Sequence, residues 1–496
     1  MKRGFGILMH IASLPGKYGI GTFSDCYAFL DFLSAAGAKY WQVLPLNPTG
    51  FGNSPYQSAA AEMLNPYFIS IEELCAEGLL TESEARSAEQ EGKYIDYGYL
   101  YETREPLFRK AYARFRKNAA FSGYVKRGEA KDYALFMALK KKHGGISFDN
   151  WEEKFKFADE GALAEFAAEN EEELQFWQFL QYTAERQWKK VRAYAENLHI
   201  SVIGDLPIYV AYDSVDVWKN PSIFKLDENR KPVKIAGVPP DYFSAEGQLW
   251  GNPVFDYAEQ EKDRFAWWRK RLERALRLFD YVRIDHFRGL DRYYEISAGR
   301  ENAVEGEWVD VPHDALFAAL RERSDLTRVI AEDLGILDEG VYELLRKTGI
   351  PGMSVLSFAF NGDENNPYLP EKIGKHTVCY AGTHDNDTLM GMLSKLSAPE
   401  EERFYVSLKN SLKKMSLHRF TNDRMKTVAA ITEMGFACKA DIFILSMQDA
   451  AFLGTEYRMN EPSTDKAQNW SVRVERKRMR PVLASRLKAL AEKYGR

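Results

Sequence analysis

Short apolar runs recur along the chain, and longer amphipathic stretches separate many of them. Eight of these runs are bounded by Gly, Pro or Asp and have the length of a β-strand. Several are apolar almost throughout, which is typical of strands buried on both faces of a parallel sheet. The eight predicted strands cover residues 5–11, 39–44, 200–208, 281–287, 328–334, 353–360, 377–381 and 441–446.

Helical periodicity marks the stretches between many of these strands. Apolar residues recur at helical spacing within residues 25–36, 172–197, 261–279, 313–323 and 338–348. Eight strands separated by helices predict an α/β fold, a (β/α)₈ TIM barrel spanning residues 1–496 as a single domain.

Three segments are too long to be plain crossovers. Residues 47–170, after the second strand, predict a mostly helical insertion, and residues 386–440, after the seventh, predict a smaller helical one. Residues 211–260, after the third strand, form an aromatic-rich insertion with few helix formers. Peripheral padding is one interpretation of such segments. All three follow the carboxyl ends of strands, however, and barrel active sites are built on that face, which favours a role near the site.

Composition excludes several classes of protein. The 67 Lys and Arg against 72 Asp and Glu give a net charge of −5 without a basic block, which argues against a nucleic-acid partner. We expect a cytoplasmic protein without a membrane partner, because no apolar stretch approaches ~18 residues and the start lacks a secretory segment. The four scattered cysteines indicate reduced thiols rather than a zinc site. The aromatic content of 14% is high and needs an explanation.

Three predicted strands end on acidic residues. Asp285 and Glu332 close the fourth and fifth strands, and Asp385 follows the seventh. For one such acid, a structural role as a helix N-cap or salt-bridge partner is about as plausible as a chemical one. Three acids at one barrel mouth favour chemistry, because burying unpaired carboxylates is costly.

Glycoside cleavage uses several carboxylates, with one at the anomeric carbon and a protonated one at the leaving oxygen. Arg283 precedes Asp285 by two residues, so both side chains face the same side of the strand. We expect the guanidinium to hold Asp285 ionised. We also expect Asp385 to lie near Glu332 and to raise its proton affinity.

These strand ends resemble the motifs of a known family. The segments VRIDHFRG (282–289), IAEDLG (330–335) and AGTHDND (381–387) are similar to those of the 4-α-glucanotransferases of the amylomaltase family, in the α-amylase clan. Further similar segments cover residues 6–15, 53–58, 204–218, 239–253 and 458–470, so the resemblance extends over essentially the whole chain.

The resemblance implies a retaining double displacement that moves a segment of an α-1,4-glucan to the 4-hydroxyl of an acceptor glucan or glucose. It implies that Asp285 is the nucleophile, Glu332 the general acid/base and Asp385 the transition-state stabiliser. The same resemblance implies α-1,4-glucans and maltooligosaccharides as partners, and sugar rings bound on aromatic faces would explain part of the aromatic excess. The residues that match substrate-binding positions are Ser54, Tyr56, Asp213, Gln248, Trp250, Arg283, His384 and Asn460.

The third strand departs from the ordinary amylase pattern. Asp205 is present, but Tyr209 and Val210 stand where amylases carry the Asn and His that follow it, and that Asn helps to bind structural calcium. The amylomaltase family shares this departure, so we expect no metal and no cofactor. Since only about fifty residues follow the eighth strand, we also expect a closing helix at 480–493 and no C-terminal β-sandwich domain.

Two alternatives stay open. An α-glucan hydrolase would share the chemistry up to the covalent intermediate and then admit water in place of the acceptor. An idle glycan-binding protein would lack one of the acids, whereas Asp285, Glu332 and Asp385 are all present. A retaining mechanism requires the carboxyl groups of Asp285 and Glu332 to lie about 5–5.5 Å apart. The oligomeric state is not indicated.

Overall fold

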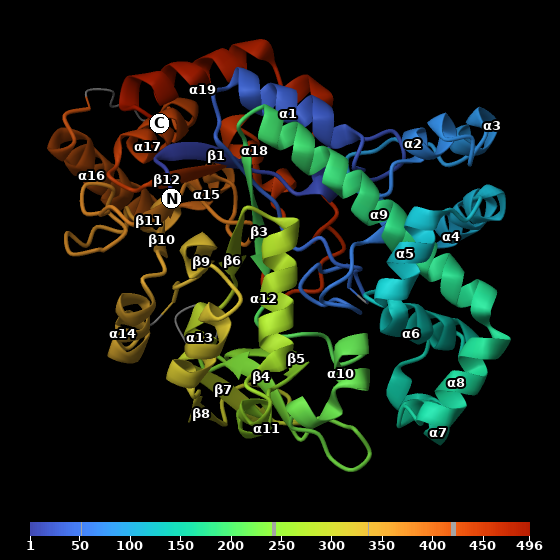
Figure 1. The fold of residues 1–496 in the computed structure, drawn as a ribbon. Coiled ribbons are helices and arrows are strands. Elements are labelled where there is room, and N and C mark those ends of the chain that lie inside the picture. Colours follow the sequence, from blue (N-terminus) through green and yellow to red (C-terminus); the bar gives the residue numbers. More distant parts are fainter. Residues whose placement is uncertain (51, 241–244, 336, 418–422) are drawn as a thin grey trace.

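The computed structural model describes the whole chain except residues 51, 241–244, 336 and 418–422. All eight predicted strands are present and form one parallel sheet, in the order β10-β11-β12-β1-β2-β3-β6-β9. The prediction of a (β/α)₈ barrel is therefore confirmed (Figure 1). The strands are β1 (Gly4–Leu8), β2 (Tyr40–Gln42), β3 (Ser201–Leu206), β6 (Tyr281–Ile284), β9 (Val329–Ala331), β10 (Gly352–Val355), β11 (Thr377–Tyr380) and β12 (Ile442–Ser446).

The barrel closes between its two outermost strands, β9 and β10. Within the described residues these strands share no ladder, and the main-chain bond that joins their segments runs from the Ala331 N–H to the Pro351 carbonyl at 2.9 Å. Elsewhere the ladder is regular, and β1 pairs with β12 from Gly4 opposite Ile442 onward.

The helices that follow the strands surround the barrel. Helix α1 lies beside the closing helix α19, where a helix was expected at 480–493, and α12 runs along the outside of β3 and β6 (Figure 1). Gly204 of β3 has no room for a side chain, because a Cβ there would lie 2.1 Å from the ring of Phe279. The surrounding helices are α1 (Asp25–Ala35), α12 (Ala266–Leu278), α13 (His313–Arg321), α14 (Glu339–Thr348), α18 (Met447–Ala450) and α19 (Pro481–Tyr494).

The expected single helix at 261–279 is wrong in one respect. Helix α11 (Tyr257–Lys262) ends before α12 begins, and Arg264 and Phe265 between them have φ angles of 59° and 56°. This left-handed turn buries the Phe265 ring almost completely. The burial of an aromatic side chain thus outweighs helical periodicity at this point.

Between β2 and β3, the described residues form eight α-helices. They project to one side of the barrel, at the right of Figure 1. The last and longest of them returns the chain to β3 and carries a row of buried aromatic residues against the others. The eight are α2 (Ile71–Ala76), α3 (Glu82–Arg86), α4 (Tyr97–Arg114), α5 (Ala119–Arg127), α6 (Lys131–Lys142), α7 (Glu153–Lys156), α8 (Glu160–Glu169) and α9 (Glu171–Asn197).

A second, antiparallel sheet lies beyond the carboxyl ends of β3 and β6 and was not expected. Its order is β5-β4-β7-β8, so two strands come from the segment after β3, which also holds α10 (Val215–Lys219), and two from the segment after β6. Ile235 and Ile296 pair where the two segments meet. The strands are β4 (Lys234–Val238), β5 (Gln248–Pro253), β7 (Arg292–Ser297) and β8 (Gly306–Asp310).

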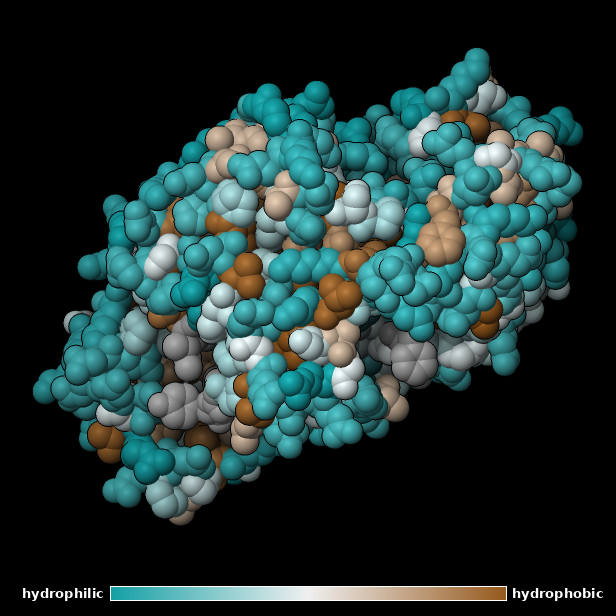
Figure 2. Space-filling model, turned by 90° about the horizontal axis from the view of Figure 1, so that it is seen from below, coloured by the Kyte–Doolittle hydropathy of each residue, from teal (hydrophilic) through white to brown (hydrophobic). Residues whose placement is uncertain are grey.

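The described part of the segment between β11 and β12 forms three further helices: α15 (Leu389–Lys395), α16 (Ala398–Lys414) and α17 (Arg424–Ala437). Within the described residues, no helix is both long and apolar enough to cross a bilayer. Seen from below, the surface is mostly hydrophilic, with hydrophobic residues in small scattered groups (Figure 2).

Candidate active site

The acids at the ends of β6 and β9 occupy neighbouring positions. Ile284 pairs with Ala331, so Asp285 and Glu332 are the next residues of two hydrogen-bonded strands. The pairing continues past the strands, since the Glu332 N–H donates to the Ile284 carbonyl at 3.0 Å and the Phe287 N–H donates to the Glu332 carbonyl at 3.0 Å. Adjacent parallel strands lie ~4.8 Å apart, so the two side chains leave the barrel close together.

Arg283 links two carboxylates beneath the mouth. Its Nη1 lies 2.8 and 2.7 Å from the two oxygens of Asp205, and its Nη2 lies 2.9 Å from Oδ1 of Asp285. The expected placement of Arg283 and Asp285 on one side of the strand is confirmed by this ion pair. Burial alone would lower the pKa of Arg283, but Asp205 and then Asp285 raise it well above its ordinary value. Arg283 is therefore a permanent cation against Asp285.

Burial raises the pKa of both neighbouring acids. For Asp285 the next influence is Arg283, which lowers the pKa, so the guanidinium favours the ionised form. For Glu332, Arg283 also lowers the pKa, and the negative charge of Asp285 adds to the effect of burial. The N–H groups of His286 and Leu334 donate to Oε2 and Oε1 at 2.7 and 2.9 Å and lower the pKa in part. The environment thus separates two similar carboxyl groups.

Among the carboxylates, Asp285 has the clearest effect on Glu332. The negative charge of Asp285 raises the proton affinity of Glu332, and the expected effect of Asp385 on Glu332 stays a prediction. Asp385 acts on Asp285, whose pKa it raises slightly. The effect of Asp285 follows from the barrel order, because β6 and β9 are neighbours whereas β11 lies beyond β10.

Asp385 is held at the rim of the mouth. Asn460 Nδ2 donates to its Oδ1 at 2.6 Å, and His384 Nε2 lies 3.3 Å from its Oδ2. The main-chain carbonyl of Asp385 accepts from Arg458 Nη2 at 2.6 Å. The Asp385 side chain is 41% exposed, so it can still accept hydrogen bonds from a bound molecule.

Three rings form an aromatic wall next to these acids. Tyr56 stacks on His384 with ring centroids 5.1 Å apart, and Trp470 lies 5.6 and 5.8 Å from the two. The Tyr56 hydroxyl donates to Oδ2 of Asp205 at 2.7 Å, which joins the wall to the network around Arg283. Trp470 was not among the predicted site residues. The sequence indicated a role for it only through its position at the end of the similar segment 458–470.

The second sheet adjoins the site at His286 and at the loop that carries Tyr56. Trp250 Nε1 donates to Gln248 Oε1 at 3.2 Å, and the Trp250 ring meets His286 edge to face at 4.8 Å. An amide pair joins this strand to the loop that carries Tyr56: Gln57 Nε2 donates to Asn252 Oδ1 at 3.0 Å, and Asn252 Nδ2 donates back to Gln57 Oε1 at 3.2 Å. The similar segment at 239–253 also includes residues 241–244, which lie outside the described residues.

Two residues expected to bind substrate are engaged with the protein itself. Asp213 pairs with Lys140 of α6 and accepts from the Phe148 N–H at 3.2 Å, so it joins the helices between β2 and β3 to the loop after β3. Ser54 Oγ accepts from the Tyr56 N–H at 3.2 Å and shapes the turn that presents Tyr56.

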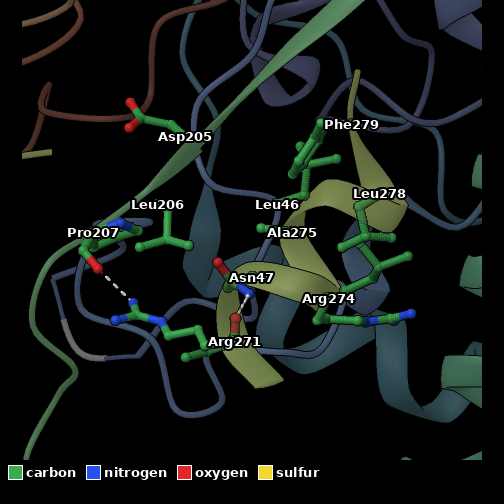
Figure 3. Close-up of a pocket in the computed structure, with 12 residues that line it drawn as sticks. Leu46, Asn47, Asp205, Leu206, Pro207, Arg271, Arg274, Ala275, Leu278 and Phe279 are labelled. Carbon is green, nitrogen blue, oxygen red and sulfur yellow. Dashed lines mark hydrogen bonds between the residues drawn. The ribbon is translucent and has the colours of Figure 1, made fainter. Parts of the chain in front are cut away.

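A small pocket beside the end of β3 is a packing space, and none of the three acids lines it. It lies between the end of β3 and α12, and Arg271 crosses it to donate to the Pro207 carbonyl at 2.5 Å (Figure 3). Asp205 contributes one wall, and the other lining residues are mainly apolar. Among the described residues, no group of three or more His, Cys, Asp or Glu side chains is arranged to hold a metal ion.

Known proteins show the same organisation over the full length. The family model described as 4-alpha-glucanotransferase matches residues 9–478. Curated 4-alpha-glucanotransferases of Clostridium butyricum and Thermus thermophilus are each 41% identical, over 98% and 99% of this chain and 100% and 99% of theirs. The solved amylomaltase from Streptococcus agalactiae in complex with acarbose superposes with a TM-score of 0.94 at 35% identity, with 100% of both chains covered. The barrel, its strand-end acids and these matches lead to one conclusion: the chain belongs to the 4-alpha-glucanotransferase family.

Proposed function

We propose that the activity is carried by Asp285 as nucleophile, Glu332 as general acid/base and Asp385 as transition-state stabiliser, acting on an α-1,4-glucan. The observation that carries this assignment is the pair of acids on adjacent strands, one of them in contact with Arg283. The neighbouring strand positions are compatible with the ~5–5.5 Å carboxyl separation of a retaining mechanism.

In the first step, a carboxylate oxygen of Asp285 attacks C1 of the donor sugar. The C1–O4 bond breaks, and Glu332 gives its proton to the departing oxygen, so that a shortened glucan leaves. In the second step, Glu332 takes the proton of an acceptor 4-hydroxyl, whose oxygen attacks C1 and displaces Asp285 with overall retention. Arg283 supports the first step because its charge keeps Asp285 ionised against the effect of burial.

Asp385 acts on the same sugar through its ring hydroxyls. Asn460 contacts one oxygen of its carboxylate and His384 the other, which leaves the remaining lone pairs for hydroxyl donors. Such hydrogen bonds strengthen as positive charge develops on the ring.

An α-glucan is the substrate class that fits the walls of this site. The partly exposed rings of Tyr56 and Trp250 offer flat apolar faces, and Gln248 and Asn460 offer planar polar groups. Sugar rings present the complementary apolar faces and hydroxyl edges. The amylomaltase of Streptococcus agalactiae, which matches the whole chain, was solved in complex with acarbose.

The test is incubation with maltotriose alone, without added metal, followed by separation of products by chain length. Glucose together with a ladder of longer maltooligosaccharides supports transfer. Glucose and maltose without longer products identify a hydrolase. Intact binding without turnover identifies a glycan-binding protein. Asp285→Asn is the matched variant, and it should abolish the ladder while the thermal unfolding midpoint stays near that of the parent.

A further inference from the structure

Asp333 follows Glu332 directly, and the reaction proposed above gives it no role. The two carboxylates accept hydrogen bonds from different parts of the chain. Glu332 accepts from the N–H groups of His286 and Leu334. Asp333 reaches across the seam of the barrel, where its Oδ1 accepts from the Met353 N–H of β10 at 2.6 Å.

This side-chain bond stands where the barrel has little main-chain pairing. Within the described residues, β9 and β10 form no ladder, and the Ala331–Pro351 bond is the main-chain tie beside it. An unpaired backbone N–H in a partly buried strand costs free energy. The Asp333 carboxylate therefore supplies the acceptor that a neighbouring strand supplies elsewhere in the barrel.

Residue 352 is adapted to this contact. A Cβ on Gly352 would lie 2.1 Å from Oδ2 of Asp333 and 2.6 Å from its Cγ, so any side chain there would displace the carboxylate. Burial raises the pKa of Asp333 to about 6, and the Met353 N–H opposes that rise. The close approach of Gly352 and the burial of Asp333 together show that the carboxylate fills a confined space.

We propose that Asp333 is a positioning residue for Glu332: it closes the β9–β10 seam and thereby holds the backbone that presents the general acid/base. This inference rests on the proposed function. A misplacement of a catalytic group by ~1 Å can cost a hundredfold in rate, so the seam need open only slightly to impair proton transfer.

The experiment compares two donors that differ in their need for an acid. The leaving sugar oxygen of maltotriose requires protonation, whereas fluoride departs from α-maltosyl fluoride without it. For Asp333→Ala we expect kcat/KM to fall by about tenfold or more on maltotriose and by no more than about threefold on the fluoride. Asp333→Asn keeps an acceptor oxygen for Met353, so it should stay within about threefold of the parent on both donors.

Two further variants separate positioning from general damage. Gly352→Ala displaces the carboxylate without changing an acid and should reproduce the donor-selective loss, which keeps the test possible if Asp333→Ala does not fold. Asp441→Ala is the matched control, because Oδ2 of Asp441 accepts from the His376 N–H at 3.1 Å at the opposite end of the barrel. It should lower the unfolding temperature and affect both donors equally.

Equal losses on both donors in Asp333→Ala and Gly352→Ala would overturn the positioning role. A loss in Asp333→Asn as large as that in Asp333→Ala would also overturn it, since the charge rather than the acceptor would then matter. Absence of a ladder from maltotriose with the parent protein would instead refute the proposed function, before any variant is compared.

Discussion

At the scale of single residues, two carboxyl groups of nearly equal chemistry are placed for opposite protonation states. Arg283 contacts Asp285 and favours its ionised form. Glu332 makes no such direct contact, and burial raises its pKa; Arg283 and the two N–H donors lower it in part, while the negative charge of Asp285 adds to the rise. Arg283 lowers the pKa of both acids, so what separates their roles is its direct contact with Asp285 and the negative charge that Asp285 places beside Glu332.

A bell-shaped pH dependence follows. Activity should fall on the acidic side as Asp285 becomes protonated and on the alkaline side as Glu332 loses its proton. Because burial raises both pKa values, both limbs should lie above the ordinary carboxyl range of ~4. Initial rates of maltotriose transfer between pH 4 and 9 measure the profile, and an alkaline limb at pH 5 or below would contradict it.

Glu332→Gln should lower the transfer activity and raise the free energy of unfolding at alkaline pH. The loss of the acid should reduce transfer by about 10²–10⁴-fold. Because the pKa of Glu332 is higher in the folded state, its contribution to stability is fully present below the unfolded-state pKa of ~4.3. That contribution is lost as the pH rises through the folded-state pKa. The amide removes this loss, so the free energy of unfolding at pH 8 should increase by about 1 kcal/mol, with no gain near pH 4.

Denaturant unfolding at the two pH values measures this effect. Glu301→Gln, at an exposed position, removes the same charge and serves as control. An equal gain in the control, or a gain in Glu332→Gln that does not depend on pH, would show that burial of Glu332 is not the cause.

At the scale of elements, the packing of α12 against β3 depends on a missing side chain. A Cβ at Gly204 would overlap the Phe279 ring. Gly204→Ala should therefore lower the free energy of unfolding by about 1–3 kcal/mol. Gly123 of α5 has open space around its Cβ direction, so Gly123→Ala should be neutral or stabilising by up to ~1 kcal/mol. Urea unfolding of both variants gives the comparison, and equal effects would refute the packing argument.

The ion pair between Asp213 and Lys140, which joins the loop after β3 to α6, permits a test of the role of Asp213. If Asp213 acts through its ion pair with Lys140, then Asp213→Asn and Lys140→Met should raise KM for maltotriose equally and cost about 1 kcal/mol of stability. If it binds sugar directly, as the sequence motif implied, only Asp213→Asn should raise KM. Steady-state kinetics on both variants decides between the two.

The barrel strands could be predicted from the sequence because each is apolar enough to be recognised alone. The second sheet could not, because β7 and β8 mix polar and apolar residues, and β7 finds its partner β4 from a distant segment. Strand ends mark the acids, but only the closed barrel decides which two share an edge.

At the scale of the whole molecule, the site is assembled from nearly the full chain. Tyr56 comes from the loop after β2, Asp285 and Glu332 from the middle strands, and Asn460 from beyond β12. Motifs identified these positions separately. The contacts among Tyr56, His384 and Trp470 depend on three distant loops meeting, which no local pattern records.

The pairing of β1 with β12 has a consequence during synthesis of the chain. Gly4 meets Ile442, so at ~5–20 residues per second one edge of the first strand waits roughly 20–90 seconds for its partner. That strand is wholly buried in the finished barrel, and an open apolar edge promotes association between chains. We therefore expect a nascent chain that is stalled before residue 441 to sediment together with chaperones on centrifugation. A chain that has been synthesised through the last strand should stay in the soluble fraction.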